Sequence, residues 1–391
     1  MSETTPTLNP AALLADANRH RITLQATLVP VSGDRFQPAG FPEVGHVIYK
    51  APRPNQTTED VCIVDSAASM ANHLEAVCHA DPRALELHED LAALPHVQCL
   101  TDDGKTKEPK RLVVTSLSEG HRLASSYFLD EKARLVTNGK PSEQTFISVL
   151  KTAFGMQDLG TKTHPLPGDW RKVFKTIYRY DPNSLVHGIL FPSLGIKISR
   201  VLTAHHEAFG AARVPSSGVK FDKLGKTTSK QPIFAVDEET ARGIRATFVL
   251  DLSLLRSFGR GSDGLTNPQK QFLLELAFWK IRQLLAAPFR FRSNCDLRCE
   301  SLKWVGADMS DPKNPDRPIE LSELYTDIKA AIEAVGFGEK DAQNERVTKV
   351  YWPSEELFKQ GNDKVKAGKG KGTDDQEPED DAAERDEEEQ S

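Results

Sequence analysis

Residues 31–42 read VSGDRFQPAGFP and directly follow residues 21–29, in which apolar and polar side chains alternate. Such alternation is typical of a half-buried β-strand. Pro30 ends the strand, and Gly33 and Gly40 allow the tight turns of a loop. The sequence therefore predicts a strand with a compact loop at its end.

This loop displays Arg35, Phe36 and Gln37, which are a planar cation, an aromatic ring and a side-chain amide. Such a set suits a polyanion with flat bases better than a small apolar ligand. The alternative is a surface loop whose Phe36 and Phe41 pack into the core. The loop alone leaves both interpretations open.

The composition is that of a globular protein. The chain has 391 residues, of which 38% are hydrophobic, enough for one large domain or two ordinary ones. No apolar run approaches the roughly 20 residues of a membrane span, and the N-terminus lacks the basic start and apolar middle of a signal peptide. We therefore expect a cytoplasmic protein without a membrane partner.

The five cysteines are odd in number and include no Cys-x-x-Cys pair. Cys295 and Cys299 supply at most half of a zinc site. We therefore expect reduced thiols, no metal and no cofactor. The cysteines are Cys62, Cys78, Cys99, Cys295 and Cys299.

The net charge of −6 is unevenly distributed. Residues 373–391 hold eleven acidic residues and one arginine, and the rest of the chain carries +4. Residues 159–230 hold twelve Lys or Arg against four acids. Because binding depends on the local field rather than the total charge, residues 159–230 indicate either a nucleic-acid surface or an ordinary solvated basic face.

Residues 65–75 read DSAASMANHLE and predict a capped helix. Met70 and Leu74 lie four residues apart and should face the core. Ser69 and Asn72 lie on a polar flank. The start of a helix offers unpaired N–H groups and partial positive charge, so an RNA phosphate resting there is one interpretation. A capped helix with a merely polar flank is the other.

Together, the loop GDRFQPAGFP and the helix DSAASMANHLE resemble the backbone subunit of the type I-G (formerly I-U) CRISPR surveillance complex, or Cascade, in the RAMP superfamily. That family carries a loop similar to GDRFQPTGFP and a helix similar to ESAQSMANRLE. Three further stretches resemble it in the same order along the chain, and the resemblance spans most of residues 19–305. These stretches are GHRLASSYF at 120–128, His187-Gly188 and RVLTAHHEA at 200–208.

The resemblance implies an α+β fold, with an RRM-like, ferredoxin-type palm whose large insertions form the fingers and thumb of a hand-like shape. A single such domain would follow a short N-terminal segment and precede a disordered acidic tail. The expected divisions are an N-terminal segment at 1–18, the domain at 19–360, palm pieces at about 19–30, 61–79, 185–208 and 244–305, a candidate thumb at 211–231, and the tail at 361–391.

The function implied by the resemblance is to bind crRNA as the backbone of an antiviral effector complex. Several copies would stack in a helical filament along one guide RNA, beside the other subunits of the complex. Target DNA would be recognised through pairing with the guide, so the protein would need only shape, charge and stacking.

The resemblance assigns RNA contacts to positions in the loop, the helix and the third stretch, and charge and location add four more. Ala39, Ala68 and His73 depart from the family pattern, where we expect Thr, Gln and Arg. The candidate RNA contacts are Arg35, Gln37, Ser69, Asn72, Arg122, Arg200, His205, Lys220 and Lys223.

Two other functions compete with this one. A metal-free endoribonuclease would take its acid and base from among His121, His187, His205 and His206, and a loop-Asp version would use Asp222. A general single-strand binder would stack bases on aromatic rings. The rings available for stacking are Phe36, Trp170 and Tyr178.

The remaining periodicities predict further elements. Asn267 and Pro268 indicate the cap and first turn of the longest helix, ending at 287. We also expect helices at 81–94, 119–128, 145–154, 170–178 and 319–335, and strands at 44–49, 97–100, 112–115, 185–191, 197–204, 243–252 and 295–305.

Overall fold

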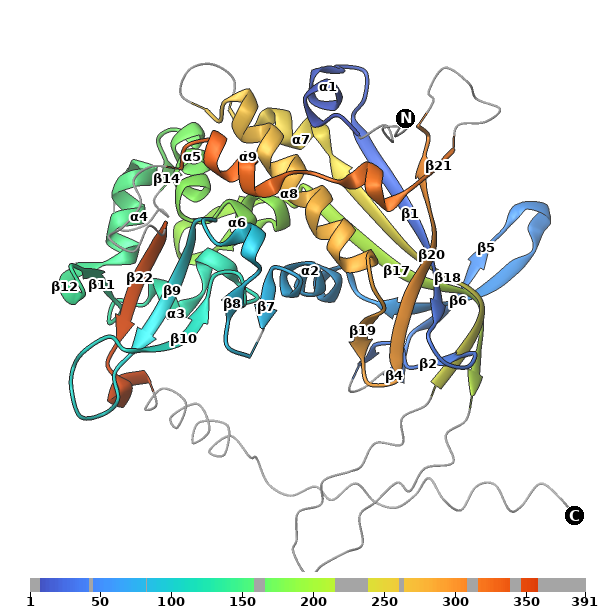
Figure 1. The fold of residues 1–391 in the computed structure, drawn as a ribbon, viewed down its shortest axis with the longest axis horizontal. Coiled ribbons are helices and arrows are strands. Elements are labelled where there is room, and N and C mark those ends of the chain that lie inside the picture. Colours follow the sequence, from blue (N-terminus) through green and yellow to red (C-terminus); the bar gives the residue numbers. More distant parts are fainter. Residues whose placement is uncertain are drawn as a thin grey trace, which may run out of the picture.

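The computed structural model describes residues 8–41, 45–81, 83–157, 166–214, 238–259, 264–307, 316–337 and 346–357. Within these residues, the largest element is a nine-stranded sheet with the path β19-β20-β1-β18-β17-β6-β5, to which β2 and β21 add at the sides (Figure 1). The strands are β1 Arg21–Pro30, β2 Arg35–Phe36, β5 Ile48–Pro52, β6 Thr58–Asp65, β17 Leu202–Val214, β18 Glu238–Asp251, β19 Phe289–Arg292, β20 Cys295–Val305 and β21 Arg317–Ile319.

Four antiparallel strands in the order β20-β1-β18-β17 form the centre of this sheet. Helix α2 (Ala67–Ala76) lies between β1 and β17 in the chain, and helix α8 (Asn267–Leu285) lies between β18 and β20. The centre therefore has the chain order βαββαβ. This arrangement confirms the predicted α+β class.

Burial in β1 follows the alternation that the sequence predicts. Ile22, Leu24 and Ala26 are fully buried, and the residues between them are more exposed. Helix α8 packs on the buried face of the sheet and is apolar on nearly all sides, as expected of a core helix. Its cap is Thr266 and not Asn267, because Thr266 and Gln269 form a reciprocal capping box.

A second, five-stranded sheet has the order β10-β9-β22-β11-β12, with β22 parallel to β9. It lies beside helices α4, α5 and α6, on the opposite side of α2 from β20 (Figure 1). Its central strand β22 comes from the end of the described chain and was not predicted from the sequence. The elements of this part are β9 His96–Thr101, β10 Arg111–Thr115, β11 Arg134–Thr137, β12 Lys140–Thr145, β22 Val347–Trp352, α3 Ser126–Leu129, α4 Phe146–Phe154, α5 Trp170–Tyr180 and α6 Pro182–His187.

Short elements complete the fold. One hydrophobic core runs beneath both sheets and includes Phe36, so the ring of the first loop packs inward. The remaining elements are α1 Pro10–Ala15, β3 Gly40–Phe41, β4 Gly45–His46, η1 Pro54–Gln56, β7 His79–Asp81, β8 Glu86–Leu87, η2 Glu89–Leu91, η3 Arg122–Ala124, β13 Met156–Gln157, β14 Leu166–Pro167, β15 Ile189–Phe191, η4 Pro192–Leu194, β16 Ile196–Ile198, α7 Leu252–Ser257, η5 Leu321–Leu324 and α9 Ile328–Ala334.

Several predicted elements are wrong. Residues 81–94 contain short strands and a 3₁₀ turn instead of a helix, and Leu85 has a positive φ of 58° that no helix accommodates. Residues 185–191 begin as helix α6, which ends where Gly188 takes a φ of 76°. The helix expected at 119–128 is split into η3 and α3. The one expected at 319–335 is reduced to η5 and α9.

Other predictions fall on residues outside the described parts of the chain. Lys220, Lys223 and Asp222 belong to this set, as do most of the candidate thumb and the whole acidic tail. Residues 211–214 are the end of β17, which pairs with β18 up to Val214 and Glu238. The division of the chain into a palm, fingers and a thumb stays a prediction.

Candidate nucleic-acid interface

The first loop is fixed to the sheet at both of its ends. Arg35 pairs with Thr240 on β18 and forms an ion pair of 2.9 Å with Glu238, while 62% of its side chain stays exposed. The backbone amide of Gln37 donates to the carbonyl of Asn294. Beyond it, the Ala39 amide donates to the carbonyl of Val64 at 2.8 Å, so the loop is hydrogen-bonded to the strand that leads into α2.

The start of α2 holds an anion that belongs to the chain itself. The Ser66 side chain accepts from Ser69 N, and buried Asp65 accepts from Ser66 N at 3.0 Å. Burial raises the pKa of Asp65, but the hydrogen bond from His73 and the charge of Arg292 outweigh it, and the pKa lies below its usual value. A carboxylate of the chain itself therefore lies at this helix start, where a bound RNA phosphate is one interpretation of the sequence.

Ser69, His73 and Asp65 do not form a catalytic triad. Asp65 Oδ2 lies 2.8 Å from His73 Nε2, and Ser69 Oγ lies 3.4 Å from the same nitrogen. A triad needs the carboxylate on one ring nitrogen and the nucleophile on the other. The cluster therefore orients the side chains at the helix start, and Ser69 is turned toward His73.

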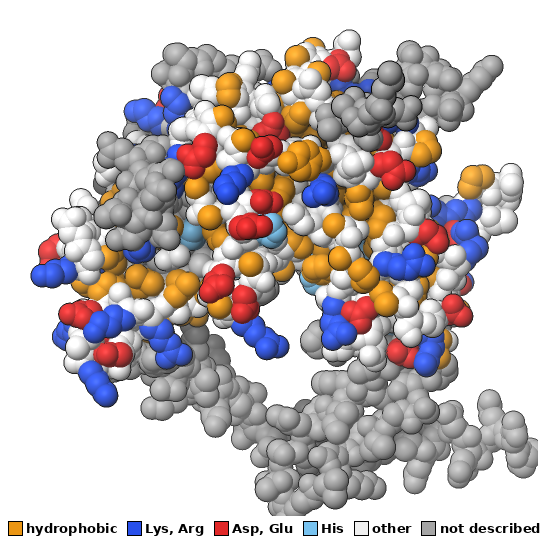
Figure 2. All heavy atoms as spheres, in the orientation of Figure 1, with side chains coloured by type: hydrophobic (Ala, Val, Ile, Leu, Met, Phe, Trp, Pro, Cys, Tyr) orange, Lys and Arg blue, Asp and Glu red, His pale blue; other side chains and the backbone are white. Residues whose placement is uncertain are grey.

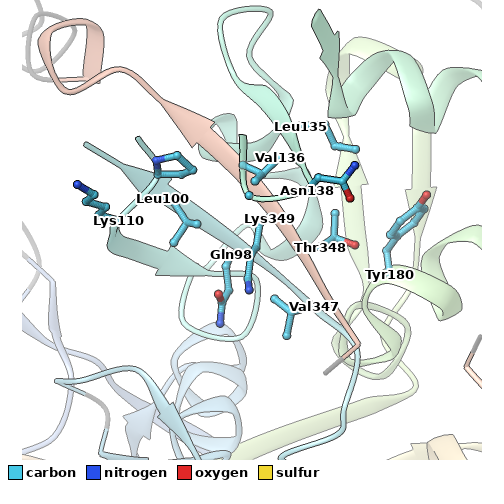
Figure 3. Close-up of a pocket in the computed structure, with 12 residues that line it drawn as sticks. Gln98, Leu100, Lys110, Leu135, Val136, Asn138, Tyr180, Val347, Thr348 and Lys349 are labelled. Atoms are coloured by element: carbon cyan, nitrogen blue, oxygen red, sulfur yellow. The ribbon is translucent and has the colours of Figure 1, made fainter. Parts of the chain in front are cut away.

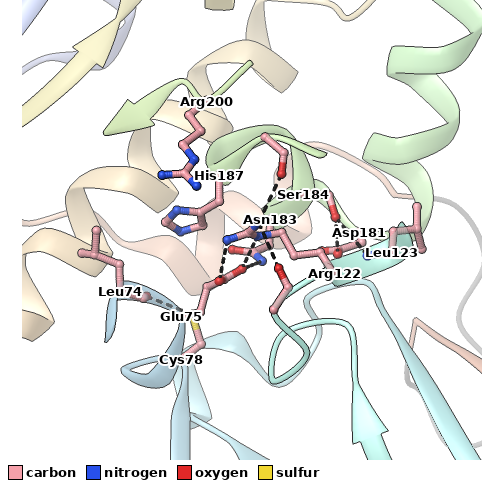
Figure 4. A network of polar contacts seen from close by, with 12 residues as sticks. Leu74, Glu75, Cys78, Arg122, Leu123, Asp181, Asn183, Ser184, His187 and Arg200 are labelled. Atoms are coloured by element: carbon pink, nitrogen blue, oxygen red, sulfur yellow. Dashed lines mark hydrogen bonds and ion pairs between the residues drawn. The ribbon is translucent and has the colours of Figure 1, made fainter. Parts of the chain in front are cut away.

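At the other end of α2, a buried polar network connects helices α2, α6 and α8 (Figure 4). Glu75 accepts two hydrogen bonds from Arg122, of 2.6 and 2.8 Å, and one of 2.6 Å from Asn183 Nδ2. Lys280 of α8 donates to Asn183 Oδ1 and lies 3.0 Å from Nε2 of His187. Arg122 is only 7% exposed, so its guanidinium is largely buried beneath the candidate interface.

A cavity of about 490 Å³ opens directly above this network. Arg200 lines it and donates to the carbonyl of Ala67 at 2.9 Å, and Lys197 lies exposed at its edge. Burial and the neighbouring Arg122 lower the pKa of Arg200. The described residues that line this cavity include no Asp or Glu. They are Gly120, His121, Arg122, His187, Gly188, Ile189, Leu190, Lys197, Ile198, Ser199, Arg200 and Thr203.

A smaller cavity of about 270 Å³ continues from the first, because Gly120 lines both. Exposed Asn72 lies at its wall together with Ser118, and the carboxylates of Glu75 and Glu119 also line it. The structure therefore brings Asn72, Arg122 and Arg200 together along one groove, which we call the α2 groove. On the face shown in Figure 2, basic and acidic side chains are mixed, so this face of the protein is not uniformly basic.

Other predicted contacts lie outside the α2 groove. His205 is exposed two residues after Thr203, on the same face of β17, and so lies next to the groove. Arg35 is farther away, because it pairs with Thr240, which lies opposite Ala212. The nine residue steps from Thr203 to Ala212 span roughly 30 Å. Sequence reasoning missed Glu75, although it ends the quoted helix, and it also missed Lys197, Asn183 and Lys280.

A larger cavity of about 800 Å³ lies against the five-stranded sheet (Figure 3). Apolar Leu100, Leu135 and Val347 line it together with Lys110 and Lys349. None of the candidate RNA contacts that the structure describes lies on it. The α2 groove therefore remains the site at which the sequence motifs meet.

The described residues contain no group of three or more His, Cys, Asp or Glu side chains placed to hold a metal ion. All five cysteines are free thiols. No described helix combines the length and the apolar character that crossing a membrane requires.

The observed architecture is an α+β protein built on a βαββαβ sheet, with a groove beside helix α2 that Lys197 and Arg200 line at one end. Residues 22–213 match the model of a family described as CRISPR-associated protein GSU0053. This stretch, just under half of the chain, contains the loop, helix α2 and the α2 groove. The match supports a CRISPR-associated protein.

Two solved structures are also similar. The crystal structure of Thermofilum pendens Csc2 is 11% identical, covers 89% of this chain and 76% of its own, and has a TM-score of 0.31. A chain of a CRISPR RNA-guided surveillance complex in a pre-nicking state is 10% identical, covers 91% of this chain and 89% of its own, and has a TM-score of 0.33. A search of curated proteins gave no match.

Proposed function

We propose that this protein is the crRNA-binding backbone subunit of a type I CRISPR effector complex, of the I-G subtype. The observation that carries the proposal is the cavity of about 490 Å³ in the α2 groove, which Arg200 and Lys197 line and whose described lining has no carboxylate. Such a groove suits the phosphate backbone of a single strand and has no dense set of groups for reading bases. The family match over residues 22–213 supports the same class.

The βαββαβ centre supports a ferredoxin-type, RRM-like palm, from which the β17–β18 hairpin extends toward a thumb. Several copies bind along one guide RNA in the cytoplasm, with the other subunits of the complex as neighbours. The guide then pairs with target DNA. Arg35 and Gln37 contact the strand at the far end of the hairpin. Lys220 and Lys223 supply further contacts to the strand.

The roles of the candidate contacts differ within this proposal. Asn72, Arg200 and His205 contact RNA directly, because each is at least partly exposed at or beside the groove. Arg122 acts indirectly, by holding α2 through Glu75. Ser69 also acts indirectly, through its contact with His73.

Co-expression with a CRISPR array and the partner subunits tests the proposal. We expect the purified complex to contain RNA of uniform length that maps to the array. Heterogeneous cellular RNA would support a general single-strand binder instead. That alternative has weak support from the aromatic residues, since Phe36 and Tyr178 are buried and only Trp170 is exposed.

An endoribonuclease is a second candidate, because His121 and His187 line the same cavity. His187 is a poor general base, since its Nε2 accepts from Lys280 and burial lowers its pKa well below the usual value. Incubating the protein with guide-containing RNA, with and without magnesium, separates the two functions. Specific cleavage that His121→Ala, His205→Ala or Asp222→Ala abolishes would establish the enzyme.

The acidic residues 373–391 shield the cationic groove from stray nucleic acid until guide RNA displaces them. Their eleven carboxylates match a cationic surface in charge. Deleting them should raise affinity for non-specific RNA at low salt. Unchanged affinity would refute the shielding role.

A further inference from the structure

His187 presents a buried hydrogen-bond donor that has no partner. The residue ends helix α6 and is 1% exposed, yet it lines the 490 Å³ cavity. Lys280 Nζ lies 3.0 Å from its Nε2. An ammonium group has donors and no acceptor, so Nε2 must be the accepting nitrogen.

A neutral imidazole that accepts at Nε2 carries its proton at Nδ1. In the described part of the chain, Nδ1 of His187 has no hydrogen-bond partner. Burial and the charges of Lys280, Arg122 and Arg200 keep the ring neutral by lowering its pKa well below the usual value. A buried donor left without an acceptor is destabilising, so an acceptor bound in the cavity would be favourable.

The surroundings of this donor favour an anion as the acceptor. Arg200 lies on the same side of the network as the His187 ring (Figure 4), and one hydrogen bond, to Ala67, uses only one of its five N–H donors. Lys197 adds charge at the rim. Leu190, which is 54% exposed beside them, offers an apolar surface of the kind that a ribose can cover.

We propose that this cavity is a seat for one phosphate group of the bound strand, whose oxygen accepts from Nδ1–H of His187 while Arg200 neutralises its charge. The inference rests on the proposed RNA-binding function and names one subsite of that groove. A phosphate group has several oxygens, so it can accept from the His187 ring and from Arg200 at the same time.

Crystals of the protein soaked in tungstate test the seat without RNA. We expect an anomalous peak within hydrogen-bond distance of His187 Nδ1, and its loss in Arg200→Gln. Density for water alone at Nδ1, while tungstate binds elsewhere on the protein, would overturn the proposal.

The second test uses RNA in which single linkages are replaced, one at a time, by neutral methylphosphonates. In the unmodified protein, we expect one linkage whose replacement weakens binding roughly tenfold, and we expect no such position in Ser199→Glu. Ser199 is exposed at the cavity, so the added carboxylate competes for the seat without disturbing the buried network. Ser199→Gln and Lys151→Gln are matched controls that should keep the sensitive position.

Failure of this inference is distinct from failure of the proposed function. If the protein does not bind unmodified RNA, the proposed function is wrong. If it binds RNA tightly but every methylphosphonate has the same effect in the unmodified protein and in Ser199→Glu, the function stands and the phosphate seat is wrong.

Discussion

Glu75 and Arg122 form a buried bidentate ion pair, with N–O distances of 2.6 and 2.8 Å, although 47 residues separate them in the chain. Arg122 adopts a φ of 54° to reach helix α2 and also donates to the carbonyl of Gly188 at 3.3 Å. A left-handed conformation at a non-glycine residue persists only where its surroundings enforce it. The pair therefore holds the wall of the α2 groove against the helix.

Removing one partner of this pair should be strongly destabilising. We expect Arg122→Ala to lower the free energy of unfolding by about 3–5 kcal/mol, because Glu75 would remain buried without its cation. Urea unfolding followed by circular dichroism measures the change. The double variant Glu75→Gln with Arg122→Met should lose less free energy of unfolding than Arg122→Ala alone. A loss below about 1 kcal/mol in Arg122→Ala would show that the pair does not hold the wall.

Gly188 and Gly195 provide a matched pair of substitutions in one hairpin. Both have positive φ, 76° and 63°, but a Cβ at Gly188 would lie 2.9 Å from Ile198 O, whereas a Cβ at Gly195 meets nothing within 4 Å. Gly195→Ala should therefore lower the free energy of unfolding only by the backbone strain, about 1 kcal/mol. Gly188→Ala should lower the free energy of unfolding by more than this. It should also weaken RNA binding, because the hairpin that lines the cavity must shift. Equal effects in melting and RNA-binding assays would contradict this account.

The sequence predicts the sheet better than it predicts the groove. Alternation alone located β1, and the capped helix at α2 followed from Ser66 and its apolar spacing. The groove depends on side chains that come together only in the folded chain, such as Glu75 and Lys280. Arg122 shows why the groove could not be predicted from the sequence. Its charge suggests a contact with RNA, but its guanidinium is bound by Glu75, which lies 47 residues away in the chain.

The missed strand β22 has a different cause. Its six residues pair in parallel with β9 and antiparallel with β11, partners that are distant in the chain. Short strands of this kind carry a weak local signal, because long-range pairing decides them. The wrong helix at 81–94 also shows tertiary context overriding local propensity.

Stability should fall in mild acid because buried histidines are neutral in the folded state. Burial lowers the pKa of His206 from 6.5 to about 3, and neither ring nitrogen has a hydrogen-bond partner in the described chain. Below pH 6.5 His206 binds a proton in the unfolded chain but not in the folded chain. Stability therefore decreases as the pH falls toward 3. From pH 7 to 5 this histidine alone should account for about 2 kcal/mol. His206→Leu should flatten the profile measured by urea unfolding at each pH, and an unchanged slope would contradict the assignment.

Truncations should distinguish the role of β22 from that of the acidic tail. Tyr351 and Ser354 both donate to Asp102, at 2.6 and 2.5 Å, and so fix the end of β22 beside β9. Ending the chain after residue 357 should leave the melting temperature nearly unchanged. Ending it after residue 345 should remove the central strand of the second sheet and lower the melting temperature by more than about 5 °C. Similar melting temperatures for the two truncations would show that β22 is dispensable.

The salt dependence of RNA binding should report the number of phosphates that each copy neutralises. If one copy contacts about four phosphates, the logarithm of affinity should fall with the logarithm of salt concentration at a slope of roughly −3. Arg200→Gln should reduce the magnitude of the slope by about 0.7, since it removes one cation next to the strand. Asn72→Ala should weaken binding without changing the slope, because its side chain is neutral. Fluorescence anisotropy at several salt concentrations measures both quantities. A slope that stays the same in Arg200→Gln would mean that the strand follows another path, such as the exposed face around Arg35.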